Sequence, residues 1–296
     1  MTSRLSVATV GIVVVFALAA SDALAQGNGN AYGHSKNRPG AAAQPSAAGS
    51  PELQTAGIST LSFGSWLDDA SVIPQGGGTM SVAFSYWRTP SYREVDVPVI
   101  DGGVGIAPRV QFNFNVPYYH AGDSDGTVVR GIGDMYVSTK IQLKDPSASD
   151  LRIGFALTPL LEILTYAPRP DASRVSWAIP ASVELRRERW RTFGSAGYFS
   201  RGALFASGAL EVALTTRTAV TGTVSRSHSI RRDELSADLG LGQSRTDVSG
   251  ALSVALNPAV SAFGAVARTI SKQDANSSTL AVTGGVAFVF EAWQSR

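Results

Sequence analysis

The sequence contains no cysteine among its 296 residues, so disulfides cannot contribute to its stability. Beyond the N-terminus it also lacks any apolar run approaching the roughly 20 residues that a membrane-spanning helix needs. Charged residues make up only 16% of the chain, and 25 Lys and Arg nearly balance 23 Asp and Glu. Because nucleic acids are bound largely by neutralising their phosphates, this balance argues against a nucleic-acid partner. The chain is rich in Gly, Ala, Ser, Thr and Val, and its stability must come from backbone pairing and packing.

The long apolar run of this chain lies at the N-terminus. Arg4 precedes the run Val7 to Ala20, and the small residues Ala23-Leu24-Ala25 follow just before Gln26. A basic residue, a short apolar run and a small-residue triplet form a secretory signal peptide with its cleavage site, so residues 1–25 are predicted to be removed on export. Gln26 stands where a bacterial lipoprotein has a cysteine, so no acyl anchor is expected.

The rest of the chain divides into three parts by composition. Residues 26–56 are dominated by Gly, Asn, Ala, Pro and Ser and are predicted to be a disordered periplasmic linker. Residues 57–77 are mildly apolar and are predicted to be a lead-in or plug segment, although a helix and an extra strand also fit the pattern. Residues 78–293 are predicted to form one β domain, because apolar and polar residues alternate there with almost no helical periodicity.

The alternation is clearest from Arg109 to Val116. One face of this predicted strand carries Val110, Phe112, Phe114 and Val116, and the other carries Arg109, Gln111, Asn113 and Asn115. The pattern recurs at 134–143 and at 174–186, where Pro180 is expected to mark a bulge. Counting such segments predicts twelve strands: 78–87, 96–106, 109–117, 131–143, 150–162, 174–185, 190–199, 202–213, 217–228, 247–256, 260–270 and 279–291.

Twelve strands predict an all-β fold, a transmembrane antiparallel up-and-down β-barrel, because an even number closes a barrel with both termini on one side. Alternation weakens at 190–199 and 260–270, so counts two higher or two lower stay open. Short periplasmic turns are expected at 107–108, 186–188, 215–217 and 257–258, with longer polar connections at the opposite end. The connections 200–201 and 144–149 do not follow this rule. Both termini are therefore expected in the periplasm.

Alternation alone does not distinguish a membrane barrel from a soluble β-sandwich or filled barrel, because only the direction of the apolar face differs. The final segment favours the membrane: Thr283, Gly285, Phe288 and Phe290 have a spacing that resembles the β-signal by which outer-membrane proteins are recognised for insertion. Aromatic residues also recur near strand ends, as in interfacial girdles. We therefore expect a bacterial outer-membrane protein, with outer-membrane lipid and the barrel-assembly machinery as partners.

Two stretches resemble a known family. Asn115-Val116-Pro117-Tyr118-Tyr119 ends one predicted strand, and Gly131-Ile132-Gly133-Asp134 opens the next, which runs on to Lys140. Together they resemble the outer-membrane channel family named for the meta pathway of phenol degradation. The resemblance implies an outer-membrane barrel that helps small, often hydrophobic, molecules across. Independently of the family, glycines entering a strand permit a bend or bulge at a barrel rim.

Inward-pointing charges are the candidates for handling a solute. Alternation assigns six to the lumen of the predicted barrel: Arg109, Asp134, Lys140, Arg152, Glu184 and Glu211. Both signs occur, which leaves two interpretations open. In a channel the charges would create a transverse field that tunes ion preference, and in a filled barrel they would pair and close the lumen. Twelve strands lie between the eight that side chains fill and the roughly 16 to 18 that enclose an aqueous channel.

A catalytic site would need a nucleophile within reach of a base. Ser227-His228-Ser229, with Glu234 nearby, supports an outer-membrane lipid hydrolase as an alternative, but a solvated loop histidine is expected. Asp123-Ser124-Asp125-Gly126 begins like a calcium loop and lacks the distal bidentate acid. No catalytic residue, metal or cofactor is therefore predicted. The sequence predicts a monomeric barrel that gives small solutes, hydrophobic ones included, a narrow passive pathway; a structural barrel with a blocked lumen is a further alternative.

Overall fold

The computed structural model describes residues 67–90, 92–123, 128–147, 151–165, 174–230, 242–271 and 277–292. The predicted signal peptide at 1–25, the predicted linker at 26–56 and residues 57–66 of the predicted lead-in segment lie outside the described residues. No helix in the described ranges is long and apolar enough to cross a membrane.

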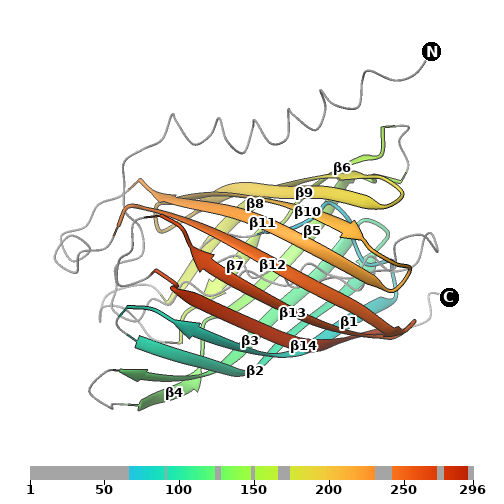
Figure 1. Cartoon of the computed structure of the whole chain (residues 1–296). Coiled ribbons are helices and arrows are strands. Elements are labelled where there is room, and N and C mark those ends of the chain that lie inside the picture. The colour runs from blue at the N-terminus through green and yellow to red at the C-terminus, as the bar shows by residue number, and fades with distance from the viewer. Residues whose placement is uncertain are drawn as a thin grey trace.

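The described residues form fourteen strands (Figure 1). In chain order these are β1 (Gly77–Arg88), β2 (Tyr92–Ala107), β3 (Val110–Asp123), β4 (Val128–Ile132), β5 (Met135–Lys144), β6 (Ile153–Leu157), β7 (Leu160–Ile163), β8 (Val175–Arg186), β9 (Trp190–Phe199), β10 (Ala203–Ala213), β11 (Thr218–Ser229), β12 (Ser244–Asn257), β13 (Val260–Thr269) and β14 (Leu280–Glu291).

The strands close into one antiparallel barrel with twelve strand positions. Consecutive strands pair along the chain, and β1 pairs with β14 to complete the ring. β4 and β5 both pair with β3, so they are two halves of one interrupted strand. β6 and β7 likewise both lie between β5 and β8. The predicted fold class and the predicted count of twelve are confirmed.

Proline explains one of the two interruptions. Thr158 and Pro159 separate β6 from β7, and Thr158 N donates to Pro180 O of β8 at 2.9 Å. Pro180 has no N–H to donate to Thr158 O, so the hydrogen-bond ladder with β8 is interrupted between β6 and β7. The bulge expected at Pro180 is absent, because β8 pairs with β9 through Pro180 without a register shift. The proline therefore interrupts the neighbouring strand and leaves its own strand intact.

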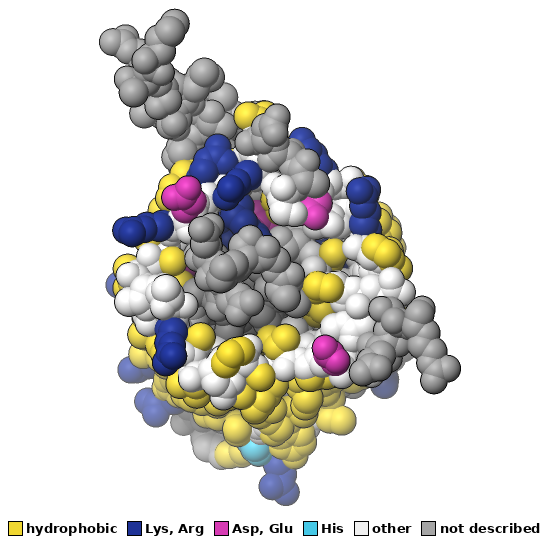
Figure 2. Space-filling view, turned by 90° about the vertical axis from the view of Figure 1, so that its right-hand side faces the viewer, with side chains coloured by type: hydrophobic (Ala, Val, Ile, Leu, Met, Phe, Trp, Pro, Cys, Tyr) yellow, Lys and Arg dark blue, Asp and Glu magenta, His cyan; other side chains and the backbone are white. Residues whose placement is uncertain are grey.

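The two faces of the sheet have opposite polarity. On β3, Gln111, Asn113 and Asn115 are buried in the barrel, whereas Phe112 is 37% exposed on the outside. Many outward positions of the other strands are likewise exposed and apolar, and they form the hydrophobic band in Figure 2. A soluble barrel has the reverse arrangement, so this polarity is the one that a bilayer requires.

The two ends of the barrel differ in their connections. One end, here called the turn end, carries the short turns after β2, β8, β10 and β12, together with the start of β1 and the end of β14. The opposite end, here called the loop end, carries the longer connections after β7, β11 and β13. Two further connections at the loop end, between β1 and β2 and between β3 and β4, are shorter than was expected for this end, because β2 begins at Tyr92 and β3 continues to Asp123.

Aromatic rings cover glycines at the seam between β1 and β14. Gly78 and Phe290 are direct cross-strand partners, and a Cβ at Gly78 would lie 2.5 Å from the Phe290 ring. Phe84 covers Gly284 in the same way on the outer face. Each glycine thus gives a large outward ring a place to lie flat across the strand pair that closes the barrel.

A charge on the outward face tests this orientation. Leu252 is 46% exposed near the middle of β12, and Leu256 is 56% exposed near the turn end of the same strand. Leu252→Arg is expected to destabilise the protein in lipid vesicles by roughly 2–4 kcal/mol, and Leu256→Arg by about 0–1 kcal/mol, because the cost of a charge falls toward the interface. Guanidinium unfolding measures both values. Equal and small costs would contradict a lipid-facing surface.

Candidate functional site

The ten residues before β1, Leu67–Gly76, pass through the inside of the barrel and are called the lead-in segment below. Leu67 and Ala70 are almost fully buried, and Leu67 packs against Phe193 of β9 and Ala209 of β10. At its end, Gly76 N donates to Gly105 O of β2 at 2.9 Å, and the chain then enters β1. The lead-in segment therefore crosses from the β9–β10 wall to the β1–β2 wall.

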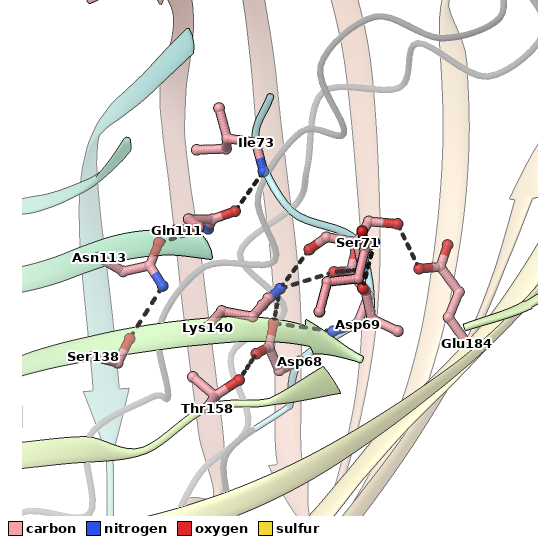
Figure 3. Close-up of polar contacts among 12 residues, drawn as sticks. Asp68, Asp69, Ser71, Ile73, Gln111, Asn113, Ser138, Lys140, Thr158 and Glu184 are labelled. Carbon is pink, nitrogen blue, oxygen red and sulfur yellow. Dashed lines mark hydrogen bonds and ion pairs between the residues drawn. The ribbon is translucent and has the colours of Figure 1, made fainter. Parts of the chain in front are cut away.

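Two adjacent carboxylates anchor the lead-in segment to two buried cations, and Figure 3 shows their contacts with one of these, Lys140. Lys140 Nζ of β5 lies 2.6 Å from Asp68 Oδ1 and 3.0 Å from Asp69 Oδ1. Arg191 Nη1 of β9 lies 2.8 Å from Asp69 Oδ2, and Arg191 Nε lies 2.8 Å from Glu211 Oε1. The pair Asp68-Asp69 therefore joins β5 to β9 across the inside of the barrel.

Further hydrogen bonds hold the rest of the lead-in segment. Lys140 Nζ also donates to Ser71 O at 3.0 Å, and Gln142 Nε2 donates to Ala70 O at 3.0 Å. The Ser71 hydroxyl donates to Glu184 Oε2 of β8 at 2.7 Å. Further bonds run from Thr158 Oγ1 to Asp68 and from the Ile73 amide to Gln111. Backbone and side-chain polar groups of this segment thus obtain partners from β3, β5, β8 and the gap between β6 and β7.

Lys140 depends on the lead-in segment for its neutralisation. Within the described part of the chain its ion-pair partners are Asp68 and Asp69 alone, and its side chain is 2% exposed. Arg191 differs, because it also contacts Glu211 and Glu184 of the barrel wall. A buried ammonium without a counter-ion is strongly unfavourable, so Lys140 and the two aspartates require one another.

The two carboxylates respond differently to their burial. Burial raises the pKa of Asp68, and the opposing charge of Lys140 does not fully offset this effect. Burial acts in the same direction on Asp69, but the charges of Lys140 and Arg191 outweigh it and hold the pKa of Asp69 below its usual value. The stabilisation by Asp69 is therefore present above its unfolded-state pKa and is lost as the pH falls through its folded-state pKa.

The structure brings three of the six predicted lumen charges into this network: Lys140, Glu184 and Glu211. Asp134 is buried in the gap between β4 and β5, where it accepts a hydrogen bond from Thr165 N at 3.3 Å. Arg109 and Arg152 lie elsewhere than predicted, since both are exposed at the turn end, in the β2–β3 turn and just before β6. Alternation predicts the direction of a side chain only within a strand, and Arg109 and Arg152 lie outside the strands, so the prediction that they face the lumen is wrong.

Sequence reasoning missed Asp68, Asp69 and Arg191. Two consecutive acids in an otherwise mildly apolar lead-in are a signal that a buried partner exists, but nothing in the sequence names that partner. Arg191 lies in β9, where alternation is weak because small residues occupy both faces. Its inward direction follows from its burial beside Phe193, whose ring lies 4.7 Å from the guanidinium carbon.

Part of the lumen wall away from the network is built from small apolar residues. Ala83, Ala251, Phe263, Ala265 and Ala287 form one buried cluster on β1, β12, β13 and β14. These residues alternate with the exposed outward positions of the same strands, so they face the inside. The charges of the network thus lie on β5, β8, β9 and β10, and the alanine cluster lies on β12, β13, β14 and β1, called the alanine-rich side below. Serines, threonines and the ion pair between Arg245 and Asp247 of β12 also face inward on this side.

The residues of the predicted insertion signal all lie on β14, the strand that closes the barrel. Thr283 faces inward and its hydroxyl lies 3.1 Å from Ser85 Oγ of β1. Gly285 leaves room for the inward ring of Phe263, because a Cβ there would lie 2.8 Å from Phe263 Cζ. Phe288 and Phe290 are 40% and 46% exposed on the outward face. Recognition of these residues by the assembly machinery stays a prediction.

His228 is not the solvated loop residue that was expected. It lies near the end of β11, is buried, and its Nδ1 is 2.9 Å from Ser244 Oγ of β12. Ser227 and Ser229 project to the opposite face of the strand from His228, since successive side chains alternate. Glu234 lies outside the described residues. No group of three or more His, Asp or Glu suited to a metal ion occurs in the described ranges.

Comparisons with known proteins bear on the fold. No protein-family model and no curated protein matches the sequence. An outer membrane channel from Pseudomonas putida F1 is similar in structure, with a TM-score of 0.59 and 12% identity over 75% of this chain and 98% of that chain. This likeness establishes the barrel fold. The KdgM porin (TM-score 0.47, 8% identity, 71% of this chain and 99% of that chain) and the CymD monoaromatic hydrocarbon channel (0.41, 7%, 74% and 89%) are more distant.

Removing the buried ammonium tests the network. Lys140→Met is expected to destabilise the protein by about 3–5 kcal/mol, because it leaves Asp68 and Asp69 buried without their cation. Arg109→Met is the matched control, since Arg109 is exposed in a turn and a surface substitution changes stability by about 0.5 kcal/mol or less. Chemical unfolding of both variants in the same lipid gives the comparison. A similar small loss in both would show that the lead-in segment is not held by Lys140.

Proposed function

We propose that this protein is an outer-membrane barrel that gives small solutes, hydrophobic ones included, a narrow passive pathway, and that the lead-in segment restricts this pathway. The observation that carries the proposal is the anchoring of Asp68 and Asp69 to Lys140 and Arg191 inside the barrel. Among the described residues the segment precedes every strand and continues into β1, so it can leave these partners without breaking the barrel.

The size of the barrel supports this function. A barrel of eight strands is filled by its own side chains, and one of about 16 to 18 strands leaves an open aqueous channel. With twelve strands, this barrel has room for a peptide segment in addition to the side chains of its wall. Displacement of that segment would therefore leave a passage of intermediate width, suited to small molecules.

The divided lumen wall supports the proposed class of solute. A solute that passes beside the network contacts charged groups on one side and the cluster of alanines with Phe263 on the other. The alanine-rich side offers apolar contact without large side chains that would fill the passage. This combination suits small molecules with an apolar part, as well as ions on the charged side.

We further propose the orientation and the family. The turn end would face the periplasm with both termini, because short turns face the periplasm in outer-membrane barrels. Outer-membrane lipid would surround the apolar band, and the barrel-assembly machinery would insert the chain through β14. Residues 115–119 and 130–140, with the barrel fold, support membership of the outer-membrane channel family named for the meta pathway of phenol degradation.

Single-channel conductance tests the restriction by the lead-in segment. Asp68→Asn with Asp69→Asn leaves Lys140 without a counter-ion and should release the segment, so conductance steps in planar bilayers are expected to become larger or more frequent by several-fold. Asp101→Asn is the matched control, because Asp101 also lies in the lumen but bonds to Ser81 and Asn115. Heat-modifiable gel migration confirms that each variant is folded. Identical conductance in all three proteins would overturn the proposed role of the segment.

The charge at position 140 provides a second conductance test. Lys140→Glu places a third acid beside Asp68 and Asp69, so it is expected to shift ion preference toward cations as well as to loosen the segment. The reversal potential under a salt gradient measures the preference. A folded barrel that is silent in the wild type and in both variants would favour a structural role with a blocked lumen.

The contact between His228 and Ser244 keeps one alternative, a lipid hydrolase, open to experiment. We expect no release of fatty acid from phospholipid or lipopolysaccharide by the wild type. His228→Ala is then expected to cost about 1 kcal/mol of stability through the lost hydrogen bond and to leave conductance unchanged. Fatty acid release that His228→Ala abolishes in a folded barrel would establish the enzyme instead.

A further inference from the structure

The outward face of the barrel carries charges of one sign at one end. Within the described strands, the outward positions near the loop end hold five charged side chains, all of them arginine: Arg88, Arg93, Arg130, Arg226 and Arg268. Seven acids of the strands alternate to the inside instead: Glu94, Asp96, Asp101, Glu162, Glu184, Glu211 and Asp247. In Figure 2, which looks onto the turn end, dark-blue side chains protrude again at the far side of the hydrophobic band.

Strand register brings three of these arginines into one row. Arg88 of β1 and Arg93 of β2 are direct cross-strand partners. On its other side, Arg88 pairs with Leu280 of β14, and the pairing of Ala267 with Ala281 places Arg268 of β13 next to Leu280. Neighbouring strands are about 4.8 Å apart, so Arg268 and Arg88 are about 10 Å apart along this row.

The remaining two arginines extend the row at both ends. Arg226 of β11 pairs with Thr246, which lies two residues from the partner of Arg268, Val248. Arg130 of β4 pairs with His120 of β3, two residues from the partner of Arg93, Gly122. The five form a continuous band from β11 through β14 and β1 to β4, called the arginine arc below. The loop end of the opposite half carries the neutral pair Trp177 and Tyr198 on its outward face.

An external anion would stabilise the arginine arc. Like charges directly opposite one another on a sheet destabilise it, and Arg88 and Arg93 are such a pair. Among the described residues, the ion pairs that arginines form involve Arg186, Arg191, Arg201 and Arg245, and no member of the arc. The turn end is different, since its exposed Arg189 follows Glu188 directly.

We propose that the arginine arc binds the phosphate groups of lipopolysaccharide in the outer leaflet. Guanidinium groups match phosphate oxygens with paired, charge-assisted hydrogen bonds. The arc lies on the outward face at the edge of the apolar band, where the phosphorylated sugars of that lipid meet its acyl chains. This proposal relies on the orientation given under Proposed function, with the loop end outside, and is independent of whether the barrel conducts a solute.

Lipid binding to the refolded mature protein tests the proposal without any substitution. Native mass spectrometry in detergent measures the affinity for three probes: bis-phosphorylated lipid A, the same lipid A after removal of its phosphates, and phosphatidylglycerol. The wild type is expected to bind bis-phosphorylated lipid A at least tenfold more tightly than either of the others. Equal affinity for the dephosphorylated lipid, or for phosphatidylglycerol, overturns the proposal.

Two matched variants locate the site. Arg88→Gln with Arg93→Gln and Arg268→Gln is expected to weaken binding of bis-phosphorylated lipid A at least tenfold. Lys144→Gln with Arg189→Gln and Arg217→Gln removes the same charge from exposed positions at the turn end and is expected to change it less than twofold. Heat-modifiable migration confirms folding, and Arg93→Gln alone serves if the triple variant does not fold, with a smaller loss of about threefold expected. Unchanged affinity in the folded arc variants overturns the proposal.

Discussion

The ladder between β1 and β14 is the contact on which the other features of this barrel depend. Direct partners run from Gly77 and Glu291 at one end to Arg88 and Leu280 at the other. Without this ladder the sheet would present two edges of unpaired N–H and C=O groups, which lipid cannot satisfy. Closure also defines an inside and an outside, so the polar side chains of each alternating strand line the lumen and the apolar ones form the outer surface. The rings of Phe84 and Phe290 over the glycines of the seam strengthen the same strand pair from the lipid side.

A closed lumen changes what charges inside it can do. Lys140, Arg191, Glu184 and Glu211 are nearly inaccessible to solvent, so each must find a partner within the barrel. Buried ion pairs are rarely better for stability than apolar packing, but separating one leaves an uncompensated charge. In this barrel the buried ion pairs determine the position of the lead-in segment more than they add to stability. Asp68 and Asp69 are neighbours in sequence and meet cations from β5 and β9, which sets where the lead-in segment lies across the lumen.

The distribution of charge around the barrel wall gives each surface a different partner. The charged side of the lumen holds the lead-in segment, and the alanine-rich side with Phe263 leaves apolar wall beside it. On the outside lies the apolar band, and the strand charges at its loop-end border are all arginines. Of the acids inside the barrel, Glu184 and Glu211 pair with Arg191, and Asp247 pairs with Arg245. The alternation of polar and apolar residues along the strands thus produces a lumen with charges of both signs, the apolar band and the arginine arc at the edge of that band.

The sequence by itself determined the features that depend on local periodicity. Alternation with period 2 identified twelve strand positions, their inner and outer faces, and Lys140, Glu184 and Glu211 as inward charges, because side-chain direction in a strand is a property of the backbone alone. Tertiary structure alone decided which charges meet. Lys140 bonds to an aspartate 71 residues earlier, and that pairing follows from closure, strand tilt and the path of the lead-in segment. Tertiary structure also decided the gap between β6 and β7, because Pro180 of β8 has no N–H to donate to the strand beside it. It also placed Arg109 and Arg152 at the turn end, since periodicity carries no information about residues beyond the ends of a strand.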